Sequence, residues 1–360
     1  MMKRSAIFLL LIGSIILLVV SPVLADPALT VQINGSVVKA PADMDVIEGQ
    51  VMVPLRWAAE ELGANSVQWD SRTHTVTIKT PQDFYNIEKL SSYACGLQTS
   101  PVERELKIWP LPDKVKNLNL SLDVPNQEWV LELKKFNPER VGLTLPIERD
   151  KINIRITSED GYFEHTSCVY SIDNHRGHYY LPMDWLGDLF KVKVDYNAAT
   201  NVLSIQTPDM EKIKTQIAQI ENILISSSAD EAIKLWGRGE QIRNGALQYA
   251  ALSPQLRREA DKSWYVRRFY WVTGGSSPQV GPITIEHRDK LSDTKIEYTL
   301  SYQELTNHPP YTTATEKMVV EKLLVNGREG WYITQILQSS IYGIIDNKSP
   351  INIVDIDNDL

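Results

Sequence analysis

Apolar residues follow two different spacings near the start of the chain. Residues 29–33 alternate, and with residues 36–38 they flank Asn34-Gly35, a favoured two-residue turn, so this stretch predicts a β-hairpin. Further on, four apolar residues recur at i, i+3, i+4 and i+7: Leu55, Ala58, Ala59 and Leu62. That stripe predicts an amphipathic helix, which Gly63 ends as a left-handed cap residue.

A longer pattern occurs twice. Residues 53–81 and 181–208 each contain a proline with a tryptophan three positions later, then Asp or Asn with Thr three positions later, then an alternating strand. Each copy predicts strand, helix, strand, turn and strand, with the proline as the first helical residue and a side-chain-capped turn. Trp57 and Trp185 are therefore expected to occupy equivalent positions in two similar folds.

The spacing of apolar residues in the rest of the chain favours an α+β protein. Residues 83–90 predict a short helix, and alternation between residues 118 and 145 predicts additional sheet. A stripe at Ile213, Ile217, Ile220 and Leu224 and the stretch 229–249 predict two helices separated by three serines. The strands expected next span residues 263–272, 283–288, 295–302, 316–324 and 331–337, with Asn326-Gly327 turning the last pair. Helices followed by a run of strands indicate an α+β domain.

The first 25 residues have the three parts of a secretory leader. Lys3 and Arg4 supply charge, residues 6–20 are apolar, and Val23 and Ala25 are the small residues of a cleavage site. We therefore expect a secreted or cell-surface protein that is cleaved after Ala25 and has no stable membrane span afterwards. An uncleaved signal anchor is the alternative.

The amino-acid composition of the chain argues against several classes of protein. The formal net charge is -8, and removal of the leader makes it more negative, which disfavours nucleic acid as a partner. Two cysteines, Cys95 and Cys168, are too few for a disulfide framework. One bridge between them and two free thiols are both open.

The residues of the first copy carry a family resemblance. The stretch "VQINGSVV" and the later "GQVMVPLRWAAEELGANSVQWDSRTHTVTI" resemble the copper amine oxidase N-terminal-like domain, or stalk domain, of exported bacterial proteins. The resemblance is weaker over about residues 152–208. It implies a small antiparallel sheet curved around one helix. It does not imply amine oxidation, so we expect neither a copper amine oxidase nor any cofactor.

A second resemblance covers about residues 210–340. The phrases "SADEAIKLWGRGEQIRNGALQYAALSPQLR" and "REGWYITQI" resemble the cone-shaped nuclear transport factor 2-like fold. Such cones enclose a pocket, and family members include enzymes and binders. The predicted organisation is a signal peptide (1–25), stalk-like repeat 1 (26–82), a β-rich segment (83–150), stalk-like repeat 2 (151–208), the cone domain (209–340) and an acidic tail (341–360).

Aromatic and basic residues of the cone domain are the candidates for a ligand pocket, since aromatics supply much of a ligand's buried surface. Period two along the predicted strand 263–272 places Tyr265, Phe269 and Trp271 on one face, although core packing is the favoured explanation of these aromatics. The six candidate pocket residues are Trp236, Arg243, Tyr249, Tyr265, Phe269 and Trp271.

Two clusters with metal-like spacing are interpreted as structural. His165 and Cys168 lie three apart on a predicted strand, hence on opposite faces, and the nearby His175 and His178 fall in a predicted turn. The alternating aspartates at residues 355–359 lack the glycine and glutamate of a calcium loop. No metal site is therefore predicted.

Catalytic motifs are absent from the sequence: there is no nucleophile elbow, phosphate-binding glycine loop or zinc-protease pair. The sequence therefore favours a non-enzymatic binding or scaffold protein, in which stalk-type modules present the cone domain. The partners implied are a cell-wall polymer, a peptide or a small molecule. The alternative is a hydrolase or isomerase that acts in the cone's pocket and would need a carboxyl group whose pKa is shifted by burial.

Overall fold

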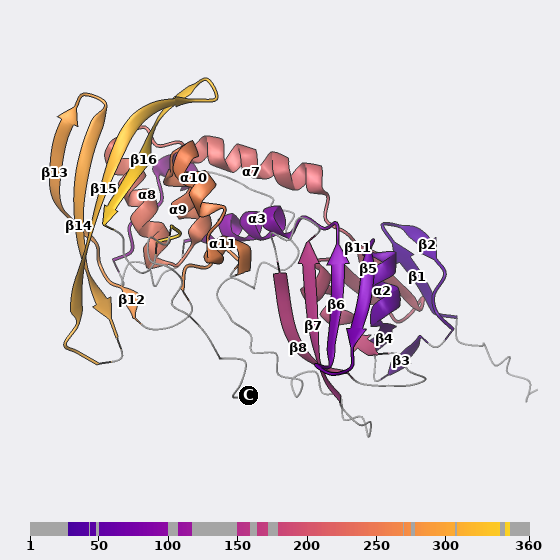
Figure 1. Ribbon diagram of the computed structural model, residues 1–360. Helices are drawn as coiled ribbons and strands as arrows, with labels where there is room; N and C mark the ends of the chain where they lie inside the picture. Colours follow the sequence, from indigo (N-terminus) through magenta and orange to yellow (C-terminus); the bar gives the residue numbers. More distant parts are fainter. Residues whose placement is uncertain are drawn as a thin grey trace, which may run out of the picture.

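The computed structural model describes residues 28–42, 44–47, 50–99, 107–116, 150–158, 164–171, 179–268, 270–274, 278–306, 308–338 and 343–345. The predicted leader, the strand-like alternation between residues 118 and 145 and most of the acidic tail lie outside these residues. The described chain forms an N-terminal lobe of small sheets and a C-terminal lobe of helices against a large curved sheet (Figure 1).

The N-terminal lobe is built from both copies of the repeated pattern. The first copy contributes β1 (Thr30–Ile33), β2 (Ser36–Val38), β3 (Asp45–Ile47), β4 (Gln50–Pro54), α2 (Leu55–Glu61), β5 (Ser66–Asp70) and β6 (Thr75–Thr80). The second contributes β7 (Asp150–Ser158), β8 (Glu164–Ser171), β9 (Tyr180–Pro182), α6 (Met183–Phe190), β10 (Lys193–Asn197) and β11 (Val202–Gln206).

The two copies share their sheets. β1 pairs in parallel with β11, β6 pairs in parallel with β7, and β4 pairs antiparallel with β9. The first hairpin of each copy therefore lies in the same sheet as the last hairpin of the other copy. One apolar cluster contains side chains from both, among them Val53, Ile78, Ile154 and Leu203. The ranges 26–82 and 151–208 thus do not enclose two separate cores, because each hairpin's apolar face is covered by strands of the other copy.

The helices of the two copies begin in the same way. Pro54 and Pro182 end strands β4 and β9 and are the N-cap residues of α2 and α6, one position earlier than predicted, with extended ψ angles of 121° and 140°. Trp57 and Trp185 are consequently each the third residue of a helix. The hairpins that follow also match, since His74 and Asn201 both have positive φ at the turns β5–β6 and β10–β11.

Side chains close these turns as predicted. Asp70 accepts hydrogen bonds from the Arg72 backbone N–H and from the Thr73 hydroxyl, both at 2.9 Å. Asn197 accepts from the backbone N–H groups of Ala199 and Thr200, at 3.0 and 3.2 Å. These Asx-type hydrogen bonds satisfy backbone N–H groups that have no strand partner in the turn. They join residues two or three positions apart, so the local sequence was enough to predict them.

Gly63 ends α2 in the left-handed conformation, with φ +88°. A Cβ added there would lie 4.0 Å from Pro81 Cγ, so it would fit, and only the backbone conformation opposes a side chain. We expect Gly63→Ala to lower the free energy of unfolding by about 1–2 kcal/mol, the cost of the left-handed region for an L-residue. Denaturant titration measures this. Glu61→Ala, at an exposed position of the same helix, is the control and should change stability by less than about 0.5 kcal/mol; equal values for the two variants would contradict the expectation.

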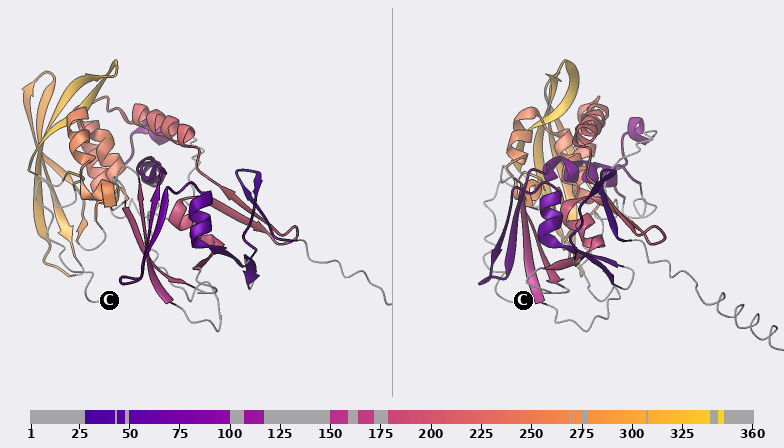
Figure 2. Two further views of the ribbon diagram at one scale, coloured as in Figure 1. Left: turned by 45° about the vertical axis from the view of Figure 1, so that its right-hand side comes forward. Right: turned by 90° about the vertical axis from the view of Figure 1, so that its right-hand side faces the viewer.

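The C-terminal lobe combines helices from two distant parts of the chain with one antiparallel sheet. Its helices are α3 (Phe84–Gly96), α5 (Asp113–Lys116), α7 (Met210–Leu224), α8 (Ala229–Gln241), α9 (Gly245–Ala251), α10 (Pro254–Ala260) and α11 (Trp264–Arg268). Its strands are β12 (Gln279–Val280), β13 (Thr284–Ser292), β14 (Lys295–Leu305), β15 (Thr312–Val325) and β16 (Arg328–Gln338). The helices cover one face of the curved sheet (Figures 1 and 2).

The predicted strands between residues 283 and 337 are confirmed, and so is the turn at Asn326-Gly327, where both residues have positive φ. The α7 stripe is also confirmed, since Ile213, Ile217, Ile220 and Leu224 are its buried residues. The architecture is therefore α+β.

Two predictions for this lobe are wrong. Residues 263–272 do not form a strand: they form α11 and a turn in which Tyr270 and Trp271 have positive φ. The stretch 229–249 is not one helix, because Arg243 has φ +56° and Asn244 caps a new helix by accepting the Leu247 N–H at 3.0 Å. In both places a buried or capping contact overrides the intrinsic propensity of the segment.

The described part of the segment 83–150 before β7 is helical, and the residues whose alternation predicts sheet in this segment lie outside the described residues. α3 extends beyond the predicted residues 83–90, and Ile87, Leu90 and Tyr93 join the core of the C-terminal lobe. Buried Arg238 of α8 reinforces this placement by donating to the backbone carbonyls of Trp109 and Gln98, at 3.0 and 3.1 Å. The C-terminal lobe therefore includes chain that precedes the second copy.

α3 also joins the two lobes and lies between them in Figure 1. Its first residue, Phe84, is buried in the N-terminal core, whereas the following turns are buried in the C-terminal core. Glu88 on this helix forms an ion pair with Lys191, which directly follows α6, at 3.0 Å, and both side chains are less than 10% exposed. Packing and charge therefore fix α3 to both lobes.

Candidate functional site

The structure describes five of the six residues that were predicted to line a pocket. Trp236 and Trp271 are fully buried, and Tyr249 is 7% exposed. Trp236 donates its indole N–H to Glu316 at 3.4 Å, and Arg243 donates to the Pro278 carbonyl at 2.9 Å. Tyr265 makes an edge contact with Trp264, and Phe269 lies outside the described residues.

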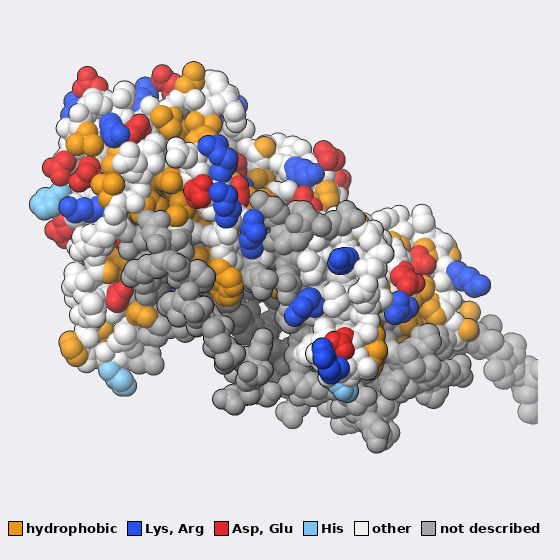
Figure 3. All heavy atoms as spheres, in the orientation of Figure 1, with side chains coloured by type: hydrophobic (Ala, Val, Ile, Leu, Met, Phe, Trp, Pro, Cys, Tyr) orange, Lys and Arg blue, Asp and Glu red, His pale blue; other side chains and the backbone are white. Residues whose placement is uncertain are grey.

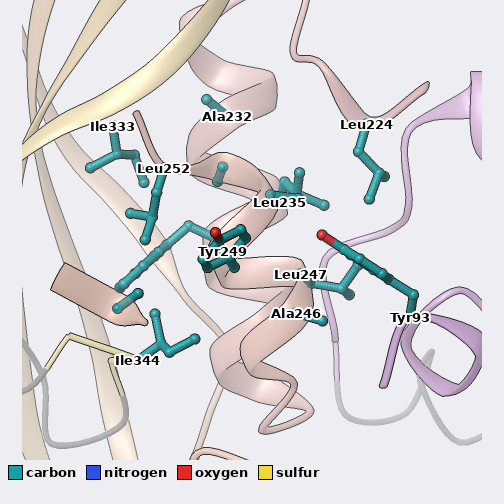
Figure 4. Packing of buried hydrophobic residues seen from close by; sticks show 14 of the residues in the cluster. Tyr93, Leu224, Ala232, Leu235, Ala246, Leu247, Tyr249, Leu252, Ile333 and Ile344 are labelled. Carbon is teal, nitrogen blue, oxygen red and sulfur yellow. The ribbon is translucent and has the colours of Figure 1, made fainter. Parts of the chain in front are cut away.

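Two of the six do meet, in a buried cluster that sequence reasoning missed. The ring centroids of Tyr249 and Trp271 are 5.2 Å apart, and Tyr85 of α3 lies at the same distance from Trp271. The ammonium group of Lys89 lies 3.9 Å from the centroid of Tyr249 and 5.3 Å from that of Trp271. Figure 4 shows how α3, α9 and neighbouring elements bring Tyr93, Tyr249 and apolar side chains together in this core.

Glu221 of α7 forms ion pairs with the cationic side chains of this cluster. One carboxylate oxygen lies 2.6 Å from Lys89 Nζ and accepts from the Tyr93 hydroxyl at 3.2 Å, while the other accepts from Arg257 at 3.4 Å. Arg257 also donates to the carbonyls of Tyr249, Ala250 and Leu252, at the end of α9. Two cations thus converge on a single carboxylate.

This arrangement sets the ionisation of its members. Burial alone would raise the pKa of Glu221, but the charges of Lys89 and Arg257 and the hydrogen bonds from Lys89 and Tyr93 outweigh it and hold the pKa below its usual range. Burial also lowers the pKa of Lys89, although Glu221 partly opposes this shift. Near neutral pH, Glu221 is therefore a carboxylate and no source of protons.

The exposed edge of the cluster borders a pocket of about 350 Å³ between α7, α10 and the β15–β16 turn. Its lining combines apolar surface with polar and charged groups and consists of Ala218, Glu221, Asn222, Ile225, Arg257, Val325, Asn326, Arg328 and Tyr332. None of the six predicted residues is among them. A volume of this size holds a small molecule or a short part of a polymer.

Sequence reasoning could have found one part of this site. Position 221 lies one turn after Ile217, beside the apolar stripe of α7, so a glutamate there signals a charge directed toward the core. Nothing local indicated its partners. Both partners are distant in sequence: Lys89 meets Glu221 because α3 packs against α7, and Arg257 reaches Glu221 from α10.

The described residues contain no group of three or more His, Cys, Asp or Glu side chains that could hold a metal ion. The side chains of His165, Cys168, His175 and His178 are not among those described. Cys95 is a free thiol in the structure, and burial raises its pKa. In the part of the chain that is described, no helix is both long and apolar enough to cross a membrane.

On the face shown in Figure 3, acidic and basic side chains are interspersed over both lobes. A ligand of the α7–α10 pocket would therefore be selected by the local groups named above rather than by a large field of one sign.

Comparison with known proteins gives one match. The family model described as Copper amine oxidase N-terminal domain matches residues 32–94. The matched range begins in β1 and continues past the first copy into α3. No curated protein and no solved structure matches the chain.

Proposed function

We propose that this chain, with its copper amine oxidase N-terminal-like segment, is an exported, non-enzymatic binding and scaffold protein. Export is proposed from the leader-like first 25 residues, with cleavage after Ala25. The C-terminal lobe is the presented domain, and the resemblance to nuclear transport factor 2-like folds belongs to this proposal. Its ligand is a cell-wall polymer, a peptide or a small molecule.

The observation that carries the proposal is the charge state of the α7–α10 pocket. Its carboxylate, Glu221, is ion-paired with Arg257 and Lys89, and its pKa is lowered. A general acid would need a raised pKa instead. Ion-paired groups, the amides of Asn222 and Asn326 and the guanidinium of Arg328 suit recognition by hydrogen bonds and charge. This supports binding over the hydrolase or isomerase alternative.

The junction between the lobes supports a scaffold role. α3 is buried in both cores, and the Glu88–Lys191 ion pair connects it to the N-terminal lobe. A C-terminal lobe attached in this way keeps a constant orientation relative to the N-terminal lobe. A presenting protein needs this property, whereas a flexible linker would let the two lobes move independently.

The proposal is tested by co-sedimentation of the purified chain with cell wall and by pull-down of culture-medium proteins. We expect retention on one of these materials, and about a tenfold weaker affinity for Arg328→Glu, equivalent to about 1.4 kcal/mol. Arg328 is exposed and lines the pocket, so the variant should remain folded.

Arg258→Glu is the matched control, because Arg258 is an exposed arginine of α10 that is not among the pocket residues. Equal weakening by the two charge reversals would mean that binding depends on overall charge and not on this pocket. Turnover of a wall-derived ester, amide or sugar by the wild type would favour the enzyme alternative.

A further inference from the structure

One residue of the α7–α10 pocket carries a polar group that has no partner in the described chain. Tyr332 of β16 is only 2% exposed and lines the pocket, and its hydroxyl makes no hydrogen bond to any described residue. Burial raises the pKa of Tyr332, and the charge of Arg257 opposes this only in part, so the hydroxyl keeps its proton near neutral pH. Buried tyrosine hydroxyls usually have a hydrogen-bond partner. The hydroxyl of Tyr332 is therefore a donor that a bound ligand can use.

The wall of the pocket beside this hydroxyl requires a glycine. Arg328, Gly330 and Tyr332 are two residues apart along a regular part of β16, so they belong to one face of the strand. A Cβ at Gly330 would lie 3.1 Å from the Tyr332 hydroxyl oxygen and would collide with Cγ2 of Ile225. Ile225 and Tyr332 both line the pocket, so any larger residue at position 330 would displace its wall.

The pocket also contains a guanidinium group that no described carboxylate neutralises. Arg328 is exposed and lines the pocket, and its side chain forms no ion pair or hydrogen bond with a described residue. The adjacent carboxylate of Glu329 pairs with Lys322 instead, at 2.6 Å. Guanidinium groups bind carboxylates and phosphates through paired N–H donors. The charge of Arg328 is therefore available to an anionic ligand.

The remaining charges of the pocket do not oppose an anion. Glu221 lines the pocket, but it is ion-paired with both Lys89 and Arg257. Arg257 is in turn held by three backbone carbonyls at the end of α9. Two cations and one carboxylate leave this group with a net charge of +1. An anion bound at Arg328 therefore meets no uncompensated negative charge from Glu221.

Other lining groups suit the end of a peptide. Asn222 and Asn326 each offer a donor and an acceptor, and neither side chain has a hydrogen-bond partner in the described part of the chain. A peptide group likewise has one donor and one acceptor. Ala218, Ile225 and Val325 add apolar surface for a small side chain. A volume of about 350 Å³ is at the small end of the range for ligand sites, so it suits the end of a chain better than a long segment.

We propose that this pocket binds the C-terminal carboxylate of a peptide, an inference that rests on the proposed binding function and names its ligand. The carboxylate pairs with the guanidinium of Arg328 and accepts a hydrogen bond from the Tyr332 hydroxyl. The amides of Asn222 and Asn326 bind the preceding peptide group, and the last side chain of the peptide packs against Ile225. A peptide with an uncharged end would leave the guanidinium without a counter-ion.

A titration with small probes tests the proposal. The purified full chain is titrated with N-acetyl-Ala-Ala, its C-terminal amide, methyl glucuronide and inorganic phosphate. The methyl NMR signals of Ala218, Ile225 and Val325 report binding in the pocket. We expect the peptide acid to bind at least about tenfold more tightly than its amide, because hydrogen bonds to a charged acceptor are the stronger ones. The sugar acid and phosphate should bind more weakly than the peptide acid, and added salt should weaken binding of the acid but not of the amide.

Two variants locate the carboxylate. Tyr332→Phe removes only the hydroxyl and should weaken binding of the peptide acid about tenfold, with little change for the amide. Arg328→Gln should weaken binding of the acid at least as much. Tyr311→Phe and Arg258→Gln are the controls, at an exposed tyrosine and an exposed arginine outside the pocket lining, and should bind as the wild type does. Because the Tyr332 hydroxyl has no partner in the described chain, Tyr332→Phe should not lower the melting temperature, so its loss of affinity is separable from unfolding.

Equal affinity for the peptide acid and its amide would overturn the proposal, and so would undiminished binding by Tyr332→Phe and Arg328→Gln. Binding of methyl glucuronide or phosphate as tightly as the peptide acid would also overturn it, since the pocket would then recognise a sugar acid or any small anion. If N-acetyl-Ala-Ala does not bind while Arg328→Glu still weakens retention on cell wall or medium proteins, this inference fails and the proposed function stands. If N-acetyl-Ala-Ala binds as expected but the chain is retained on neither material, the ligand chemistry stands and the proposed function fails.

Discussion

Replacing Glu221 by glutamine is expected to lower the free energy of unfolding of the C-terminal lobe by about 3–5 kcal/mol, because it leaves buried charge without its counter-ion. Lys89 is 6% exposed in its side chain and lies 2.6 Å from the carboxylate that would be lost. Tyr93 and Arg257 would lose their acceptor as well. Urea denaturation followed by tryptophan fluorescence measures the difference.

Glu211→Gln is the matched control for this variant. It removes a carboxylate from the same helix at a position where the side chain is 90% exposed. A change within about 0.5 kcal/mol is expected, as for most surface substitutions. If the two glutamine variants proved equally stable, the Lys89–Glu221–Arg257 cluster would contribute nothing beyond an ordinary surface pair.

The carboxylate of Glu221 also makes the free energy of unfolding depend on pH. The pKa of Glu221 is lower in the folded protein than its ordinary value of 4.5, so between these two values the unfolded chain binds more protons. Its contribution is present above pH 4.5 and is lost as the pH falls through the folded pKa. Glu221→Gln should therefore show a shallower loss of stability than the wild type below pH 4.5.

The second large effect is expected at the junction between the lobes. Lys191→Met leaves Glu88 buried without its cation and should cost about 3–5 kcal/mol. Because this pair connects α3 to the N-terminal lobe, we expect the variant to unfold in two separable transitions where the wild type unfolds in one. Differential scanning calorimetry resolves the two cases.

A double variant separates charge burial from packing. Glu88→Leu together with Lys191→Met replaces the pair by apolar side chains of similar size and should recover part of the loss, since such replacements are often neutral or stabilising. Full additivity of the two single changes would show that the groups do not interact. A single transition in every variant would show that α3 packing alone couples the lobes.

The features that were readable from sequence depend on a few neighbouring residues. Asn34-Gly35 and Asn326-Gly327 form tight turns because both residues of each pair tolerate positive φ. The α7 stripe follows from 3.6 residues per turn, and the Asp70 and Asn197 turns follow from hydrogen bonds over two or three residues. These interactions are local, so the pattern of side chains is enough to predict them.

The strand prediction for residues 263–272 was wrong for a related reason. The aromatic run after Ser263 has strand propensity, but Ser263 accepts the Val266 N–H at 3.3 Å and starts a helix. Trp271 then fills a space between Tyr85 and Tyr249, which come from α3 and α9. Burial of one indole against distant rings outweighs the small intrinsic preference of the segment.

The turns, the amphipathic helices, the two similar copies and the α+β class could be predicted from the sequence, because short-range sterics and periodicity specify them. Long-range packing settles which copy covers which sheet, to which core α3 belongs, and which charges meet at Glu221. Strands β1 and β11, for example, come from opposite ends of the N-terminal lobe's sequence and still pair residue by residue. Their pairing is selected by the burial of complete apolar faces, a property of the assembled lobe that no local segment contains.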